Sequence, residues 1–274
     1  SSRKLVKKPQ QLNKSSNFSA IISFMNLSAG IKPHFDINKI KFATAESIYK
    51  KAIDLYESGK VTGFEEKFNG FSAIVLGTKP YRVFVEEKRY DYGRCECYLG
   101  QNETLCKHMV AVALYAVLGG KPLKQEDKKV IYSPKCSGNL GELSKKQLTE
   151  VEESINAAIK YIKPYRGPSK IWFSYQDSLS EGCNRLSSIV SELPVSFETA
   201  DLMIKLLLRL DKKLTLGGVD DSDGEVGGFI EETVGVLLEY AKLKPSCIKS
   251  FQQLSGKETC FSWEEPFLRE FNLK

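Results

Sequence analysis

Histidine is scarce in this chain of 274 residues, which contains only His34 and His108. A nucleophilic enzyme built on a Cys-His or Ser-His-Asp arrangement would have to use one of these two side chains. The sequence also lacks a Gly-x-x-x-x-Gly-Lys-Ser/Thr phosphate loop, a dinucleotide-binding fingerprint and a His-Glu-x-x-His metalloprotease motif. We therefore expect a protein without catalytic activity, and no small-molecule substrate can be named.

Long hydrophobic runs are missing as well. The longest, Met109–Leu118, has ten residues, which is too short to span a bilayer and is typical of a core helix. No apolar segment of a secretory signal follows the charged residues that begin at Arg3. Hydrophobic residues nevertheless make up 42% of the chain, which is ample for buried cores. These features favour a cytoplasmic protein with no membrane partner.

Charge is unevenly distributed along the chain, although the net charge is only +6. Residues 1–150 carry 25 Lys and Arg against 15 Asp and Glu, whereas residues 151–274 carry 15 against 19. A basic half is compatible with a polyanionic partner such as DNA, but it is also common in proteins that never bind nucleic acid.

Cysteine is concentrated at one place in the basic half. Cys95-Glu96-Cys97 and Cys106-Lys107-His108 lie within fourteen residues. Three thiolates and one imidazole are a common ligand set of structural Zn²⁺. Cys95 and Cys97 would project from the same face of an extended strand, and a helix starting near Cys106 would lower the pKa of its thiol, with help from Lys107. The sequence thus predicts one structural Zn²⁺ held by Cys95, Cys97, Cys106 and His108.

The other four cysteines are widely scattered, at Cys136, Cys183, Cys247 and Cys260. Scattered thiols in a zinc protein are typical of a reducing compartment. Cys183 falls on a helical stripe of apolar residues, and we expect it to be a small buried residue and not a nucleophile.

The order of motifs around the cysteines resembles the SWIM zinc finger family. Upstream of Cys-x-Cys and Cys-x-His stand a Tyr-x-x-Gly-x-Val motif at Tyr56–Val61 and a Tyr-x-Val motif at Tyr81–Val83. The resemblance covers about residues 43–119. It implies a zinc-stabilised module that binds DNA, RNA or protein.

Residues 44–118 read as helix, then strands, then helix. A helical stripe begins after Thr44, a candidate N-cap, and ends before Gly59. Asn69-Gly70, the favoured pair of a type I′ hairpin turn, separates two predicted strands. The predicted strands cover residues 61–68, 71–76 and 81–85. We expect an α+β fold with a small antiparallel β-meander, a zinc knuckle and a helix that ends at Gly119.

The second half has the pattern of an all-α helical bundle. Its expected helices are interrupted by Pro164 and Pro194, and Ser262 with Glu265 forms a candidate capping box for a last short helix. Our predicted division of the chain is an N-terminal arm at 1–42, a zinc-finger domain at 43–120, a linker at 121–143 and a helical domain at 144–274.

An acidic loop at 217–225 interrupts this helical half. Counted from Asp221, the loop places acidic residues at positions expected of a calcium-binding EF-hand, but Val226 occupies the sixth position, where glycine is needed. Two other interpretations stay open, namely carboxylates that cap the next helix and a contact surface for a basic partner. The candidate contact residues are Asp220, Asp221, Asp223 and Glu225.

Two binding hypotheses follow for the zinc module. In the first, basic residues bind phosphates and interleaved tyrosines, among them Tyr90 and Tyr92, stack on bases of DNA or RNA. The candidate residues for that surface are Lys88, Arg89, Arg94, Lys107 and Tyr98. In the alternative, the protein is an adaptor whose helical domain and acidic loop bind a protein partner without any nucleic acid. Solvated lysines and packed tyrosines would account for the same pattern without a ligand.

Overall fold

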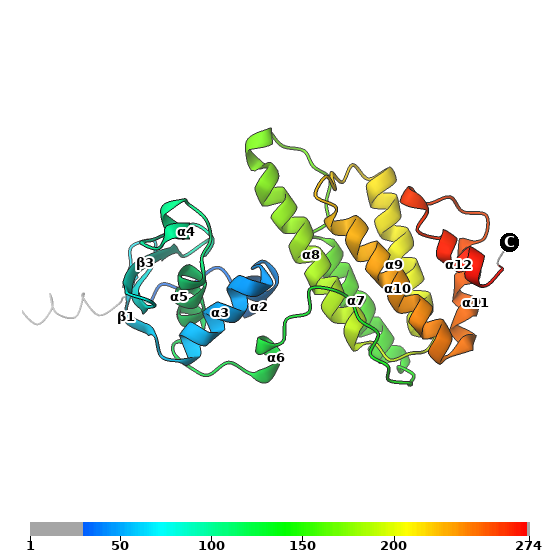
Figure 1. The fold of residues 1–274 in the computed structure, drawn as a ribbon, viewed down its shortest axis with the longest axis horizontal. Coiled ribbons are helices and arrows are strands. Elements are labelled where there is room, and N and C mark those ends of the chain that lie inside the picture. Colours follow the sequence, from blue (N-terminus) through cyan, green and yellow to red (C-terminus); the bar gives the residue numbers. More distant parts are fainter. Residues whose placement is uncertain (1–29, 273–274) are drawn as a thin grey trace, which may run out of the picture.

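The computed structural model describes residues 30–272, and most of the expected arm at 1–42 lies outside them. Figure 1 shows two groups of elements, a smaller one that contains all the strands and a larger one made of helices. The described part of the chain is therefore α+β and mostly helical, as expected. None of its helices combines the length and the apolar character needed to cross a membrane.

The strands form one antiparallel sheet in the order β1-β2-β3-β4. Their bounds are β1 Val61–Lys67, β2 Gly70–Leu76, β3 Pro80–Glu86 and β4 Gly93–Cys95. Side chains alternate across the sheet, so Ala73, Val75, Val83 and Val85 are buried on one face. This arrangement confirms the predicted small β-meander.

The β1–β2 hairpin differs from the expected turn by one residue. Lys67 pairs with Gly70, so the connecting residues are Phe68 and Asn69, and Gly70 already belongs to the sheet. Gly70 and Asn69 both have ordinary negative φ, which rules out the type I′ turn. A Cβ atom at Gly70 would lie 2.1 Å from the carbonyl oxygen of Val85. This glycine is required by the close approach of β3, and not by the turn.

One helix, α5 (Lys107–Leu118), packs on the buried face of the sheet, and α2 (Ile37–Phe42) and α3 (Glu46–Glu57) pack against α5. Residues 108–114 of α5 are all buried, because this helix lies between the sheet and α3. Gly119 ends α5 in the left-handed conformation, as predicted. Thr44 does not cap α3. Its hydroxyl instead forms a 2.9 Å hydrogen bond with the hydroxyl of Tyr90, and Ala45 holds the N-cap position.

The larger group is built on four long helices. They are α7 Lys145–Ile159, α8 Trp172–Glu192, α9 Phe197–Thr215 and α10 Glu225–Leu243. The short helices α11 (Ile248–Phe251) and α12 (Glu265–Glu270) follow. The predicted capping box at Ser262 is wrong, because Ser262 has a φ of +54° and α12 begins without a side-chain cap. Capping boxes occur instead at the starts of α7 and α9.

Buried apolar side chains form two separate cores. One draws its residues from Phe35 to Leu123, and the other from Ile155 to Phe267. Cys183 is 4% exposed in the second core, which confirms its expected burial. The segment at 121–143 contains a short helix, α6 (Gln125–Lys128), and hydrogen-bonds to both groups. The predicted domain boundaries themselves stay predictions.

Candidate metal centre

The predicted ligands come together at the start of α5. Cys95 is the last residue of β4, Cys106 is the N-cap of α5, and His108 lies in the first turn of that helix. Cys97 is the N-cap of α4 (Tyr98–Gln101). All four side chains are buried, and their ligand atoms lie within 4.8 Å of one another. In the described part of the chain, no other group of three or more potential metal ligands is found.

Cys95 and Cys97 reach the cluster by a different route from the one expected. The chain leaves the sheet after Cys95, so the two side chains do not project from one strand face. The amide of Cys97 donates to the sulfur of Cys95 at 3.5 Å, and the amide of Gly100 donates to the sulfur of Cys97 at 3.4 Å. A Cβ atom at Gly100 would lie 2.4 Å from Cβ of Cys95. The knuckle therefore needs glycine at this position, which the sequence analysis missed.

The distances fit a tetrahedral metal ion. Nδ1 of His108 lies 3.7 Å from Sγ of Cys95 and 3.9 Å from Sγ of Cys106. Zinc–sulfur and zinc–nitrogen bonds of ordinary length put neighbouring tetrahedral ligands about 3.6–3.8 Å apart. Because these separations nearly match, the cluster can hold one metal ion with little movement. Soft thiolates with one imidazole favour zinc among the common metal ions.

The pKa values of the Cys95 and Cys106 thiols are shifted in opposite directions. Hydrogen bonds, first from Cys95 and then from His108, lower the pKa of Cys106 to about 4, and the backbone amide of Met109 contributes to the same shift. The pKa of Cys95 is raised, because it donates to Cys106 and is buried. A lowered pKa of Cys106 was predicted, but it comes mainly from neighbouring side chains; the helix start contributes through the amide of Met109, and Lys107 does not contribute. A bound cation would replace the remaining thiol protons.

His108 is oriented by an aromatic neighbour. The ring of Tyr81 packs on the imidazole, with 4.6 Å between the ring centroids. Nδ1 faces the sulfurs, while Nε2 is buried without a hydrogen-bond partner among the described residues. Nδ1 is therefore the ligand atom. Beside the cluster lies a cavity of about 570 Å³ whose lining includes Ile48, Lys51 and Leu99.

The candidate nucleic-acid residues are not gathered on one surface. Tyr98 and Lys107 line the cavity beside the cluster, and the Tyr98 side chain is 80% exposed. Arg94 pairs across the sheet with Phe84, on the face opposite the helices. Lys88 and Arg89 are exposed between β3 and β4, where Arg89 is paired with Asp91.

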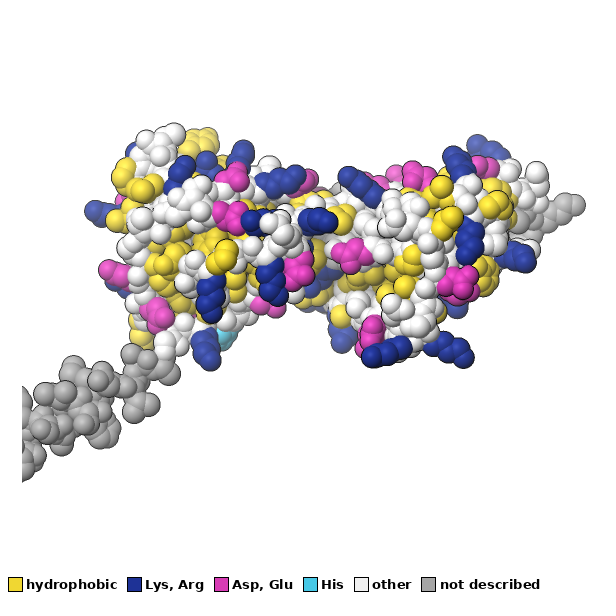
Figure 2. Space-filling view, turned by 90° about the horizontal axis from the view of Figure 1, so that it is seen from below, with side chains coloured by type: hydrophobic (Ala, Val, Ile, Leu, Met, Phe, Trp, Pro, Cys, Tyr) yellow, Lys and Arg dark blue, Asp and Glu magenta, His cyan; other side chains and the backbone are white. Residues whose placement is uncertain are grey.

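The tyrosines expected to interleave with these basic residues differ from one another. Tyr90 is only 2% exposed, so its predicted role in stacking on bases is wrong. Tyr92 is exposed, but the guanidinium of Arg89 covers its ring at 4.1 Å from the centroid. On the face shown in Figure 2, basic and acidic side chains are interspersed over both groups of elements, and hydrophobic side chains gather over the smaller group.

The acidic loop is tied into the helical group. The Asp221 carboxylate accepts hydrogen bonds of 2.8 Å from the amides of Val226 and Gly227, in the first turn of α10. Asp220 accepts from the indole of Trp172 at 3.2 Å, and Asp223 is exposed. Glu225 begins α10, and burial raises the pKa of its half-buried carboxyl group. The helix-capping interpretation holds for Asp221. Because Val226 is buried inside α10, the loop is not an EF-hand.

Removing the Asp221 cap tests this interpretation. We expect Asp221→Ala to lower the free energy of unfolding by about 1–2 kcal/mol, because two amides at the helix start lose their acceptor. Asp223→Ala is the matched control, since this exposed carboxylate makes no hydrogen bond to α10, and should change stability by less than about 0.5 kcal/mol. Chemical denaturation measures both. Equal effects of the two substitutions would contradict a capping role for Asp221.

Removing one metal ligand tests the cluster. We expect Cys97→Ser or His108→Ala to lower the metal content and to speed amide hydrogen exchange across residues 90–118, because β4, α4 and α5 lose their common anchor. Elemental mass spectrometry and hydrogen-exchange mass spectrometry provide the readouts. Cys136→Ser, which alters a thiol outside the cluster, should change neither. A ligand variant that keeps one ion per chain and its full stability would refute the assignment.

No known protein-family model, curated protein or solved structure matches this chain. The buried Cys/His cluster is compatible with a zinc finger.

Proposed function

We propose that this chain is a noncatalytic binding protein of the SWIM zinc-finger type, stabilised by one structural Zn²⁺. The observation that carries the proposal is the buried cluster of three sulfurs and one imidazole nitrogen that joins β4, α4 and α5. The motif order in the sequence supports the same family. The geometry of the cluster is compatible with the ion, and its identity as zinc is part of the proposal.

A structural role follows from the number of protein ligands. A catalytic zinc ion keeps a coordination position for water or substrate, whereas this cluster supplies four protein donors and all of them are buried. His34, the other histidine, is exposed outside the cluster. These features support a protein without catalytic activity.

Free thiols support an intracellular location. None of the seven cysteines forms a disulfide, including the four outside the cluster. A zinc thiolate centre and unpaired cysteines are stable where glutathione and thioredoxin keep thiols reduced. We place the protein in the cytoplasm on this ground.

The surface beside the metal offers the best binding site for a polynucleotide. Tyr98 presents an exposed ring on the short helix α4, and Lys51 and Lys107 line the neighbouring cavity. An exposed aromatic ring with nearby ammonium groups can stack on a base while its phosphates are neutralised. Lys88 lies between β3 and β4 and Arg94 on the sheet face opposite the helices, and neither lines this cavity.

A protein partner is the second candidate, favoured by exposed apolar side chains. Leu99 is 41% exposed next to Tyr98, and Ile74 and Leu76 are equally exposed on the face of the sheet that no helix covers. Such side chains, gathered on one unit, fit an apolar protein interface. The acidic loop contributes less to an adaptor role than expected, because Asp220 and Asp221 are engaged within the protein.

Salt dependence separates the two candidates. We expect labelled single- or double-stranded oligonucleotides to bind the full chain at low salt, with affinity that falls steeply as ionic strength rises. Tyr98→Ala and Lys51→Ala/Lys107→Ala should each weaken binding about tenfold or more, because they remove a stacked base or two phosphate contacts. Fluorescence anisotropy measures the affinity.

The control for these variants is Lys242→Ala, an exposed change in the helical group, which should leave the affinity within about twofold. Absence of binding at low salt would eliminate the nucleic-acid role and leave the protein adaptor as the function of this surface.

A further inference from the structure

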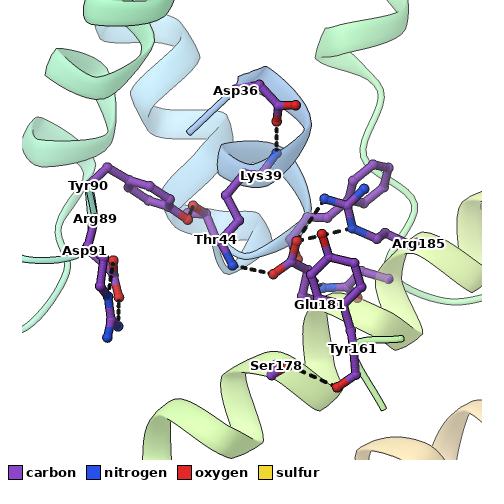
Figure 3. A network of polar contacts seen from close by, with 12 residues as sticks. Asp36, Lys39, Thr44, Arg89, Tyr90, Asp91, Tyr161, Ser178, Glu181 and Arg185 are labelled. Carbon is purple, nitrogen blue, oxygen red and sulfur yellow. Dashed lines mark hydrogen bonds and ion pairs between the residues drawn. The ribbon is translucent and has the colours of Figure 1, made fainter. Parts of the chain in front are cut away.

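The two groups of elements meet around a buried carboxylate. Glu181, in the middle of α8, has no exposed side-chain surface and is paired with Lys39 of α2. The guanidinium of Arg185 holds the same carboxylate through Nε at 3.1 Å and Nη2 at 2.8 Å. Figure 3 shows the two cations approaching Glu181 from the two groups. A carboxylate buried this deeply needs such partners, since an unpaired charge would be strongly destabilising.

Arg185 also packs between aromatic rings of the two groups. Its guanidinium carbon lies 5.0 Å from the ring centroid of Phe42 in α2 and 4.7 Å from that of Tyr161, just after α7. The neighbouring Asn184 donates a 2.9 Å hydrogen bond to the backbone carbonyl of Phe42. The junction is thus ordered by side chains that come from α2, α8 and the segment that follows α7.

A cavity of about 800 Å³ opens beside this junction. Four of its lining residues are basic and none is acidic. The buried Glu181 is not part of the lining, and it is paired with two of these four basic residues. The basic residues are Lys39, Lys160, Lys163 and Arg185. Within residues 30–272, Lys160 and Lys163 form no ion pair, and both are exposed. With Glu181 included, the charges around the cavity sum to a net positive value.

The three carbonyl groups of residues 161–163, which follow α7, are already hydrogen-bonded within the protein. Carbonyl groups at a helix C-terminus carry partial negative charge, which would disfavour an anion. Here Ser178 donates to Tyr161 at 2.9 Å, Lys213 to Ile162 at 2.6 Å, and Tyr175 to Lys163 at 2.9 Å. Ser188 also lines the cavity, and Ala157 and Ile189 give it an apolar portion.

We propose that this cavity binds a small molecule carrying a phosphate or pyrophosphate group. The ammonium and guanidinium groups of the four basic lining residues can donate hydrogen bonds to the oxygens of such a group and balance its charge. The volume falls within the range of small-molecule sites, and the apolar lining can accommodate the uncharged part of the ligand. Lys39 and Phe42 belong to the smaller group of elements, whereas Lys160, Lys163 and Arg185 belong to the larger group. The bound ligand therefore bridges the two groups.

Titration calorimetry of the full metal-loaded chain with inorganic pyrophosphate at low salt tests the proposal. We expect saturable binding that Lys160→Ala/Lys163→Ala weakens at least about tenfold, because two charged contacts are lost. Lys242→Ala/Lys249→Ala removes the same charge from exposed positions outside the cavity lining and should change the affinity less than about twofold.

A second pair of variants tests the cavity without removing a lysine. Ser188→Glu places a carboxylate in the lining and should abolish pyrophosphate binding, whereas Ser174→Glu, an exposed position on the same helix outside the lining, should not. Circular dichroism confirms that each variant is folded.

Three results would overturn the proposal. The first is absence of pyrophosphate binding to the unaltered chain at low salt. The second is equal weakening by the cavity variants and their controls, which would indicate unspecific attraction to a basic surface. The third is displacement of pyrophosphate by an oligonucleotide with hydroxyl ends, which would assign the cavity to a polynucleotide backbone.

Discussion

The smaller group of elements depends on the convergence of three sulfurs and an imidazole on one point. β4 is only three residues long and α4 only four, and elements this short make too few hydrogen bonds to be stable on their own. Both flank the cluster and are continuous with it through Cys95 and Cys97. A structural zinc ion contributes on the order of 10–16 kcal/mol to the folding of small units, which is comparable to the whole stability of an ordinary domain. The proposed ion would therefore decide whether this end of the sheet has a defined structure.

The helical group has a different basis of stability. Its four long helices bury a continuous apolar core, and no potential metal cluster is found there among the residues described. The two groups are joined by the pairing of Glu181 with Lys39, and Arg185, one turn further along α8, holds the same carboxylate. Loss of either cation would leave a buried carboxylate with too little compensation, at a cost of about 3–5 kcal/mol. The junction thus favours one arrangement of the groups, and the basic cavity beside it is a product of that arrangement.

Much of the metal centre could be predicted from the sequence, because its four ligands lie close together along the chain. Ligand types, their spacing and the apolar run after His108 together specify a cluster at the start of a helix. The sequence did not reveal how Cys97 reaches it, since the chain turns there with the help of Gly100 and leaves the strand. Thr44 and Ser262 have the residue types of helix caps, but tertiary contacts and backbone geometry give them other roles.

The junction between the groups could not be predicted in this way. Lys39 and Glu181 are 142 positions apart, and nothing in the residues around either one indicates the other. The predicted type I′ turn at Asn69-Gly70 was wrong for a related reason. Gly70 is required because strand β3 approaches it closely, and local turn preferences do not include that contact. Periodicity and spacing identify elements and short-range sites. Pairings between distant segments appear only in the folded chain.

The most direct test of the central claim is X-ray absorption spectroscopy at the zinc edge, combined with elemental analysis of the purified chain. The account predicts one zinc ion per chain, with three sulfur neighbours at about 2.3 Å and one nitrogen neighbour at about 2.0 Å. A folded chain that contains no metal, or in which Cys95, Cys97 and Cys106 are joined by disulfides, would contradict it.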